Sequence, residues 1–313
     1  MDLNIIRYFD SESESSSDDD FFTEYVLMRR PKIFRQRNPP LDTWDDLGFC
    51  QRYRLSKAIV MWLLNLIGCY LKTPTTRNHA ISPLEQILLT LRFYATGTMQ
   101  QCSGDFFGIS KSAACGENAE LYRNRKDVFS INVQVVADAD LKIRNIVARW
   151  PGSVHDSTIF NNSRVKHLMN SGQLGRCCLL GDRGYGLKQY LLTPLADPRT
   201  AAEKLYNESQ IRTRNVVERT FGVWKRRFPC IGSQLRVKLE NVQPIIVSTA
   251  ILHNICIMNR EDLPTCESVP DSIESESNII LPFSEIDQQY RGELITTYFS
   301  SLLNSHENPI IIE

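Results

Sequence analysis

The sequence predicts an α/β protein in which a helical N-terminal region precedes a domain of mixed strands and helices. Helix signals dominate before residue 115, and a strand pair with a tight turn follows near residue 130. A fully apolar run at Cys177–Leu180 is typical of a strand at the centre of a sheet. With 313 residues, of which 42% are hydrophobic, the chain can bury one large core or two smaller ones.

The N-terminal region contains several helix signals. Leu47–Leu71 is predicted to be helical, and Ser82-Pro83-Leu84-Glu85 forms a capping box with proline at the first helical position. A helix is therefore expected over Pro83–Tyr94. A short helix at Thr98–Phe107 and a third beginning at Lys111 would give the order of a helix-turn-helix, an order that any small helical bundle also gives.

A strand pair and a further helix follow. Phe129–Val136 alternates and is rich in β-branched residues, Asp138-Ala139-Asp140 forms the turn, and Ile143–Trp150 returns. The two turn aspartates are candidate metal ligands, but Asp is favoured in turns for its backbone hydrogen bonds. A helix is expected from Val154 to Met169. Asp156 near its start is either a favourable charge at the positive end of the helix dipole or a site residue.

Two carboxylates form the strongest functional signal. Asp182 emerges at the carboxyl end of the predicted central strand, where ligands collect in open α/β sheets. Glu218 lies 36 residues later, in the basic helical run Arg212–Arg227. A carboxylate at a sheet edge and another on a neighbouring basic helix suit a metal-dependent enzyme that acts on nucleic acid.

The helix that carries Glu218 has two distinct faces. Its predicted buried stripe consists of Val217, Phe221, Trp224 and Phe228. The basic residues opposite are Arg212, Arg219 and Arg226. Glu218 lies beside the stripe, on the side of Arg214 and Lys225, so it is either a partner of Arg214 in an i,i+4 salt bridge or a metal ligand. The candidate DNA-binding residues are Arg214, Lys225, Arg226, Arg227 and Lys111.

The formal net charge of zero hides an uneven distribution. Residues 1–20 and 261–313 together carry 18 acidic and 2 basic side chains, which leaves 34 basic and 18 acidic side chains in residues 21–260. A basic surplus of this size favours a polyanionic partner such as DNA, although a solvated surface with acidic tails gives the same count. Residues 11–20 and 261–277 are rich in Ser, Glu and Asp, which predicts flexible tails. We hypothesise that these tails screen the basic core when DNA is absent.

The cysteines and apolar runs bear on the compartment. Nine cysteines without a Cys-x-x-Cys pair indicate a reducing compartment and argue against structural zinc. The longest apolar run, Ala58–Leu71, is too short to span a bilayer. The N-terminus lacks the pattern of a signal peptide, so no membrane partner is expected.

Six short motifs occur in a fixed order between Glu117 and Cys256. They are Tyr122-Arg123-Asn124-Arg125-Lys126, Trp150-Pro151-Gly152-Ser153-Val154-His155-Asp156, Leu180-Gly181-Asp182-Arg183-Gly184-Tyr185, Leu192-Thr193-Pro194, Val217-Glu218-Arg219-Thr220-Phe221 and Leu252-His253-Asn254. In this order they resemble the PIF/Harbinger superfamily of transposases and the host nucleases derived from them. The segment Ser82–Ala113 also resembles the family's helix-turn-helix region.

The resemblance implies an RNase H-like DDE nuclease core that cuts DNA phosphodiesters with a divalent metal, Mg²⁺ or Mn²⁺, held by four acidic residues. Asp156, Asp182 and Glu218 match three of them and would be both catalytic residues and metal ligands. The resemblance further implies a Myb/SANT-like partner protein and a nuclear location, with the cytoplasm as an alternative. The expected divisions are an acidic tail and linker at 1–40, a truncated helical region at 41–115, the nuclease domain at 116–260 and an acidic tail at 261–313.

The chain departs from the family pattern at one place. Relatives carry the first catalytic Asp in an Asp-Gly-Thr-His segment on the first strand, whereas this chain contains no Asp-Gly dipeptide. Cys115 runs straight into Gly116, so some tens of residues are missing, and with them the end of the third helix, a central strand and one ligand. A skipped exon, an incorrect gene model or a decayed copy would each give this junction. The neighbouring strands are expected to have unpaired edges.

Three functional hypotheses follow from these observations. The motifs favour a DNA nuclease, the missing segment favours a catalytically inactive DNA-binding or regulatory protein, and a scaffold for protein contacts is a third alternative. We expect this chain to cut DNA poorly or not at all.

Overall fold

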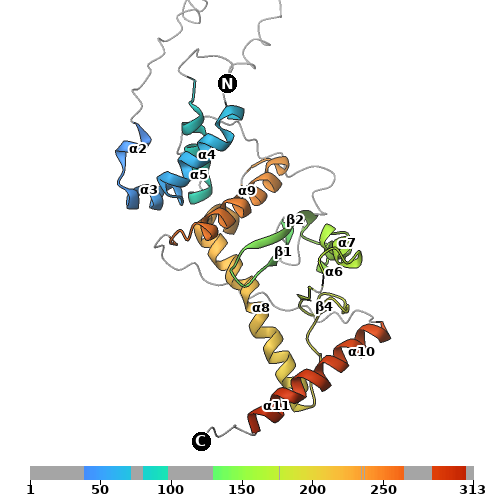
Figure 1. The fold of residues 1–313 in the computed structure, drawn as a ribbon. Coiled ribbons are helices and arrows are strands. Elements are labelled where there is room, and N and C mark those ends of the chain that lie inside the picture. Colours follow the sequence, from blue (N-terminus) through green and yellow to red (C-terminus); the bar gives the residue numbers. More distant parts are fainter. Residues whose placement is uncertain are drawn as a thin grey trace, which may run out of the picture. The chain divides into compact units, whose positions relative to one another are not determined.

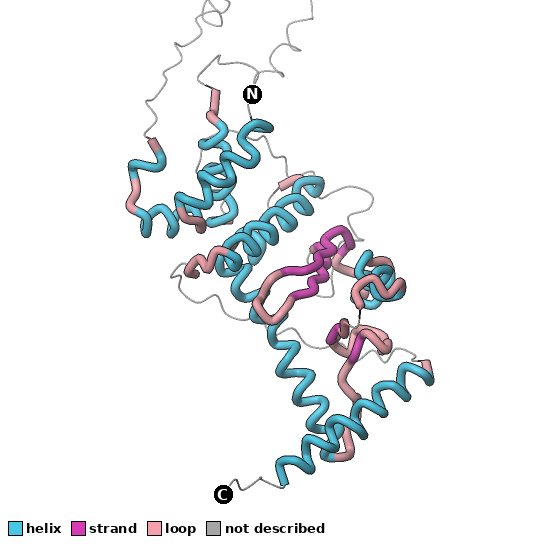
Figure 2. The backbone as a smooth tube through the Cα atoms, viewed as in Figure 1, coloured by secondary structure: helices cyan, strands magenta, loops and turns pink. Residues whose placement is uncertain are grey.

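Helices predominate in the computed structural model, which describes residues 39–71, 80–97, 130–175, 177–233, 235, 237–263 and 284–307 (Figure 1). The strands of the described ranges form two short pairs (Figure 2). The predicted α/β class is therefore present as a mixed but mostly helical fold.

The N-terminal helices begin and end at local signals. The region contains α2 (Pro40–Thr43), α3 (Asp46–Tyr53), α4 (Lys57–Ile67) and the short 3-10 helix η2 (Gly68–Leu71). The single helix predicted over Leu47–Leu71 is wrong, because Arg54 adopts a left-handed conformation with a φ of 66° and ends α3. Ser56 then starts α4 by accepting the Ile59 N–H.

Helix α5 (Pro83–Thr96) confirms the predicted capping box. The Ser82 hydroxyl accepts the Glu85 N–H, and the Glu85 carboxylate accepts the Ser82 N–H at 2.7 Å. Gly97 closes the helix with a φ of 62°, which is a conformation that glycine adopts without strain. The other helices of the predicted helix-turn-helix, at 98–115, lie outside the described residues.

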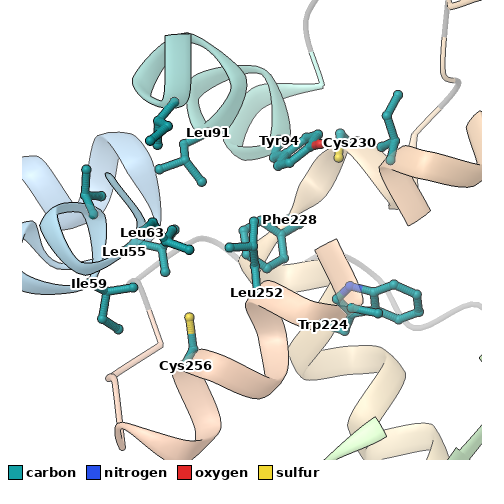
Figure 3. Close-up of a cluster of buried hydrophobic side chains, with 14 of the residues drawn as sticks. Leu55, Ile59, Leu63, Leu91, Tyr94, Trp224, Phe228, Cys230, Leu252 and Cys256 are labelled. Atoms are coloured by element: carbon teal, nitrogen blue, oxygen red, sulfur yellow. The ribbon is translucent and has the colours of Figure 1, made fainter. Parts of the chain in front are cut away.

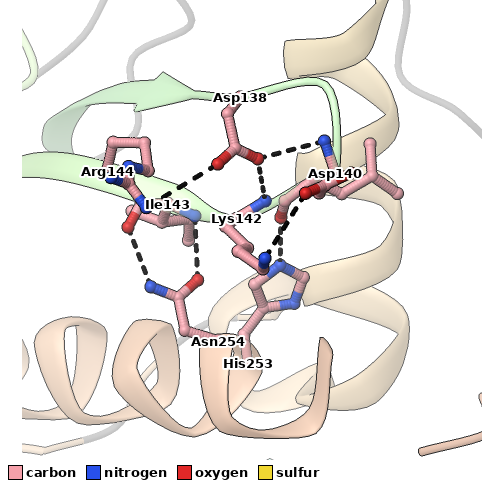
Figure 4. A network of polar contacts seen from close by, with 8 residues as sticks. Asp138, Asp140, Lys142, Ile143, Arg144, His253 and Asn254 are labelled. Carbon is pink, nitrogen blue, oxygen red and sulfur yellow. Dashed lines mark hydrogen bonds and ion pairs between the residues drawn. The ribbon is translucent and has the colours of Figure 1, made fainter. Parts of the chain in front are cut away.

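The predicted hairpin is confirmed. Strands β1 (Ile131–Ala137) and β2 (Ile143–Pro151) pair antiparallel. The Asp138 carboxylate accepts the N–H groups of Asp140 and Lys142 at 3.1 and 3.0 Å, so this aspartate shapes the turn (Figure 4).

Helix α9 (Leu239–Met258) holds this hairpin through the motif Leu252-His253-Asn254 (Figure 4). The Asn254 amide accepts the Ile143 N–H and donates to the Ile143 carbonyl, both at 2.8 Å. The His253 Nε2 lies 2.8 Å from the Leu141 carbonyl. The motif that helped to indicate the family therefore has a structural role here: it attaches the turn end of the hairpin to the core.

The second strand pair is separate from the first. Strands β3 (Leu179–Leu180) and β4 (Leu191–Leu192) pair parallel, and the predicted strand at Cys177–Leu180 is thus only two residues long. Within the described ranges, β1 pairs with β2 alone and β3 with β4 alone. The described strands therefore form two separate two-stranded sheets.

The helix predicted from Val154 to Met169 is two helices, α6 (Asp156–Asn161) and α7 (Arg164–Asn170). Ser163 separates them, because its hydroxyl accepts the Lys166 N–H and caps α7. The first of the two helices begins at Asp156, after the N-cap residue His155.

One hydrophobic core joins the N-terminal helices to α8 (Ala201–Arg227), η6 (Pro229–Gly232) and α9 (Figure 3). Fully buried members of this core are Phe49, Leu55, Val60, Phe228, Cys230 and Cys256. Tyr94 meets Phe228 edge to face, with ring centroids 6.4 Å apart. The helical region before residue 97 and the mixed region after residue 130 thus share a single core.

The predicted apolar stripe on α8 is confirmed in its C-terminal half. Trp224 and Phe228 are buried, whereas Val217 and Phe221 are only partly buried. By length and composition α9 could cross a membrane, as could the bent pair formed by α3 and α4 with η2. In α9 the apolar side chains serve the core described above, to which Leu252 and Cys256 contribute.

The C-terminal segment corrects a prediction. Residues 284–307, expected within a flexible acidic tail, form α10 (Glu285–Leu294), the π-helical turn η7 (Ile295–Phe299) and α11 (Ser300–Glu307). Ile295 and Phe299 are buried against the start of α8, and the Phe299 ring meets Tyr206 edge to face. Apolar residues at helical spacing provide this contact, and the acidic composition around them concealed it.

A buried carboxylate fastens this segment to the loop before β4. The Asp287 carboxylate accepts hydrogen bonds from the Lys188 ammonium and from the Gln189 N–H, both at 3.1 Å. The Arg291 guanidinium donates to the Thr193 carbonyl at 3.2 Å. The C-terminal helices therefore support the β3–β4 pair.

The His253 contact predicts a pH dependence of stability. Burial lowers the pKa of His253, the hydrogen bond to Leu141 opposes this, and Arg227 lowers it further. His253 in the unfolded chain, with its ordinary pKa, binds a proton more readily than His253 in the folded chain. The contribution of neutral His253 to the free energy of unfolding is therefore complete above about pH 6.5, and it is lost as the pH falls through the lower pKa of the folded state. The free energy of unfolding, measured with urea at pH 7.5 and at pH 5, should fall more between these two pH values for the wild type than for His253→Gln. Exposed His167→Gln is the control, and parallel losses in wild type and His253→Gln would contradict the prediction.

Candidate active site

Three different elements position the predicted acidic residues. Asp156 is the first residue of α6, Asp182 follows β3, and Glu218 lies on α8. All three are at least partly exposed.

Asp182 is fixed by the strand pair and by α8. The Gly181 N–H donates to the Leu192 carbonyl at 2.9 Å, and the buried Gln210 amide donates to the Gly181 carbonyl at 2.8 Å. A Cβ on Gly181 would lie 2.9 Å from the Tyr185 ring, so the backbone here approaches its neighbours too closely for a side chain. The Asp182 carboxylate itself accepts the Gly184 N–H at 2.8 Å.

Arg214 lies between two of the three carboxylates. Its Nη1 is 3.9 Å from the Asp182 Oδ2 and its Nη2 is 3.8 Å from the Glu218 Oε1. The Arg214 side chain is 17% exposed, against 37% for Asp182 and 67% for Glu218. The anticipated i,i+4 pair of Arg214 with Glu218 is therefore present, and it extends to Asp182.

Asp156 is held by an amide from β1. The Asn132 Nδ2 donates to the Asp156 Oδ1 at 3.0 Å and to the Val154 carbonyl at 2.9 Å. Gln134 lies two residues further along the same strand and therefore on the same side. Its amide contacts the Tyr185 hydroxyl at 3.3 Å.

Tyr185 links the acidic residues electrostatically. Burial raises its pKa well above the ordinary value, Asp156 and Asp182 raise it further, and Gln134 and Arg214 act in the opposite direction. Both aspartates therefore act on the same hydroxyl. Tyr185 stays protonated at neutral pH, so it can donate a hydrogen bond.

Sequence reasoning missed the neutral residues of this site, which are Asn132, Gln134, Tyr185 and Gln210. A signal existed for two of them, because amides at alternating positions of an otherwise apolar strand point to one polar side. No local pattern reveals Gln210, since its partners lie 29 and 18 residues away.

The site does not fit a metal as it stands. The ranges that the structure describes contain no group of three His, Cys, Asp or Glu side chains that could hold a metal ion. Carboxylates suit Mg²⁺ or Mn²⁺ chemically. However, Asp182 and Glu218 already share the Arg214 cation, and Asp156 is engaged by Asn132.

One predicted DNA-binding residue is wrong. Arg227 is fully buried, and its guanidinium donates to the Arg54 carbonyl at 3.3 Å and the Glu261 carbonyl at 2.9 Å. Lys225 and Arg226 are exposed, as predicted for phosphate contacts. Lys111 lies outside the described residues.

The class of the protein follows from a family comparison. Residues 105–254 match the family described as DDE superfamily endonuclease, and all three predicted acidic residues lie inside this match. Residues 105–254 thus resemble a DDE superfamily endonuclease domain, and that superfamily is RNase H-like.

Similar proteins make the assignment more specific. The chain is 29% identical to the mouse (Mus musculus) protein named "Putative nuclease HARBI1" over 323 aligned positions, which cover 83% of this chain and 93% of that protein. The human (Homo sapiens) protein of the same name is 28% identical over the same shares. "Protein ALP1-like" of Arabidopsis thaliana is 27% identical over 48% of this chain and 40% of that protein. No solved structure matches. The resemblance to Harbinger transposase-derived nucleases is confirmed.

The length of the alignment also bears on the missing segment. It has 323 positions, but 83% of 313 residues is only about 260. The mouse protein therefore has about 60 residues inside the match without a counterpart in this chain. That number agrees with the predicted loss of some tens of residues.

Two adjacent arginines should differ sharply in their effect on stability. We expect Arg227→Ala to lower the free energy of unfolding by roughly 3–5 kcal/mol, because it leaves a cavity and two carbonyls without their donor. Exposed Arg226→Ala should change it by less than about 0.5 kcal/mol. Urea denaturation of both variants checks this, and similar effects of the two substitutions would contradict the role of Arg227.

Proposed function

We propose that this protein acts on duplex DNA and that Asp156, Asp182 and Glu218 are the acidic residues of its nuclease site. The observation that carries the proposal is the approach of Asp182 and Glu218, 36 residues apart in sequence, to one side of α8 next to Arg214. Their place within the endonuclease match supports it.

The charge of the chain supports DNA as the substrate. The basic surplus lies in residues 21–260, and α8 carries an exposed row formed by Arg212, Arg219 and Arg226. At 1.5 Å per residue this row is about 21 Å long, enough to follow several phosphates. We therefore propose that duplex DNA lies along this side of α8, with Lys225 reaching the phosphates from the side of the helix that carries Glu218.

The superfamily usually works with a divalent metal, and we propose Mg²⁺ or Mn²⁺ for this site. The metal would polarise a phosphate oxygen and activate the attacking group. Asp156, Asp182 and Glu218 would hold it by family resemblance. In the arrangement described above these side chains do not converge on one point, so we propose that this chain hydrolyses DNA poorly or not at all.

A second candidate is a DNA-binding or regulatory protein without nuclease activity. The separation of the described strands into two pairs favours it, because a site built on a continuous sheet depends on the strand that joins its halves. By family resemblance we also propose a nuclear location and a Myb/SANT-like partner.

Plasmid nicking distinguishes the two candidates. We expect supercoiled plasmid to stay intact when it is incubated with the purified chain in either Mg²⁺ or Mn²⁺. Three carboxylates that do not converge on one point do not replace a four-ligand site. Gel analysis of relaxed plasmid measures the result. Strong metal-dependent nicking that Glu218→Gln abolishes and Glu208→Gln preserves would overturn this expectation and establish the active nuclease. Glu208 is a matched control because it also pairs with an arginine at i,i+4 on α8.

DNA binding tests the part of the proposal that both candidates share. We expect affinity for a short duplex to fall with rising salt, since phosphate contacts release counterions. Arg219→Ala and Arg226→Ala together should weaken binding and reduce the salt slope by roughly 2. Fluorescence anisotropy at several salt concentrations checks this, with exposed Lys238→Ala as the control. A wild-type chain that does not bind duplex DNA would leave the protein-contact scaffold as the remaining hypothesis.

A further inference from the structure

Helix α4 is apolar on its exposed side as well as on its buried side. The buried side includes Ile59 and Leu63, which lie in the main core (Figure 3). On the other side, Trp62 is 50% exposed and Leu66 is 56% exposed. A helix that is apolar all round is normally covered all round, so the exposed side of α4 has the character of a contact surface.

The exposed residues of α4 form one continuous stripe. At 100° per residue they fall within an arc of about 140°. We call this surface the α4 stripe, and its members are Ala58, Met61, Trp62, Asn65 and Leu66. The sequence has no charged residue from Ala58 to Leu71. The stripe therefore offers nothing to the phosphates of DNA or to a charged protein surface.

We propose that the α4 stripe binds the α4 stripe of a second copy of this chain, with the two helices antiparallel. The chain then forms a symmetric homodimer in which each contact occurs twice. This inference goes beyond the proposed function and does not depend on it.

The stripe is symmetric about its midpoint, which lies between residues 63 and 64. Met61 and Leu66 are equally far from this point, and so are Trp62 and Asn65. An antiparallel pair around a twofold axis therefore places Met61 against the partner's Leu66 and Trp62 against the partner's Asn65. The indole N–H of Trp62 is a donor only, and the side-chain carbonyl of the partner's Asn65 accepts it.

Asn65 gives this pairing its register. A single asparagine in an otherwise apolar stripe lowers the stability of paired helices but selects the alignment in which its amide has a partner. Shifting one helix by a turn would place the Asn65 amide against an aliphatic side chain and leave it without a hydrogen bond.

A membrane surface fits this helix less well than a second copy does. Helices that lie on a bilayer have a polar face rich in Lys and Arg opposite the apolar one. The opposite face of α4 is instead buried in the protein core. The pair formed by α3 and α4 with η2 is also bent by 58° and is not a straight span.

The size of the stripe predicts a weak dimer. Tyr70 of η2, which is 85% exposed, extends the surface beyond Leu66. A patch of this kind offers on the order of 500 Å² per copy. Two copies then bury about 1,000 Å², which is close to the lower limit of a specific interface. We therefore expect a dissociation constant in the micromolar range.

Sedimentation velocity of the full chain tests the proposal. The wild type should pass from monomer to dimer between about 1 and 100 μM. Leu66→Asp should raise the dissociation constant at least about tenfold, because each copy then buries an unpaired carboxylate in the interface. Ile286→Asp on α10 is the matched control, since Ile286 is 64% exposed but lies outside the stripe, and it should dimerise like the wild type.

Cross-linking tests the antiparallel arrangement. A mixture of Met61→Cys and Leu66→Cys chains is treated with a short bismaleimide, and the linked peptides are identified by mass spectrometry. Links between positions 61 and 66 should exceed links from 61 to 61 and from 66 to 66. An excess of the like links would contradict the proposed arrangement.

A wild-type chain that stays monomeric at about 100 μM overturns the proposal. Equal effects of Leu66→Asp and Ile286→Asp also overturn it. Binding to phosphatidylcholine vesicles that Leu66→Asp abolishes, with a monomer in solution, assigns the stripe to a membrane instead. Far-UV circular dichroism checks that each variant is folded, and Leu66→Ser carries the same expectation should Leu66→Asp not fold.

Discussion

The buried guanidinium of Arg227 is the contact on which the rest of the fold depends. It lies in the last turn of α8 and donates to the carbonyls of Arg54, which closes α3, and Glu261, which follows α9. Carbonyls at or just after the C-terminal ends of two helices, α3 and α9, therefore meet one cation that lies in the last turn of α8, and helix C-termini favour positive charge. Removing a guanidinium from water costs several kcal/mol unless such partners replace the solvent. This arrangement ties the N-terminal helices, α8 and α9 into one core and fixes the position of α8 along its axis.

Because α8 is held in this position, it determines where the site residues that it carries lie. Its C-terminal half is anchored in the main core by Trp224, and its N-terminal half packs against the C-terminal helices through Tyr206. Between the two, Gln210 bonds to the strand pair, so the residues one and two turns later face the loop after β3. Asp182 and Glu218 approach each other because one helix is held at both ends, although neither acid contributes to the core.

Local signals were predictable from the sequence, and distant ones were not. The capping box at Ser82 and the turn at Asp138 depend on residues a few positions apart, so the sequence contains the whole interaction. Arg227 was misassigned to the surface because its partners lie 173 and 34 residues away, and nothing near it in sequence shows them. The C-terminal helices were missed for a related reason: their acidic composition suggested a tail, while the apolar spacing around Phe299 acquires meaning only when Tyr206 is beside it. In the candidate site, the acids were found through short motifs, whereas the cation between two of them depends on how α8 meets the strand pair.

Family identity and activity depend on different properties of this chain. A family match recognises residue types in order, and that order survives when a segment between them is lost. A metal site needs oxygens from several elements within about 2–2.6 Å of one point. It therefore depends on the strands that fix the spacing between those elements. Here β1 supports Asp156 through Asn132, and β3 leads to Asp182, yet the described parts of these strands belong to different sheets. Among the residues that the structure describes, no backbone ladder then holds the two aspartates at ligating distance, and the positive charge beside Asp182 is supplied by Arg214. The motifs can therefore persist in a chain whose carboxylates are neutralised from within.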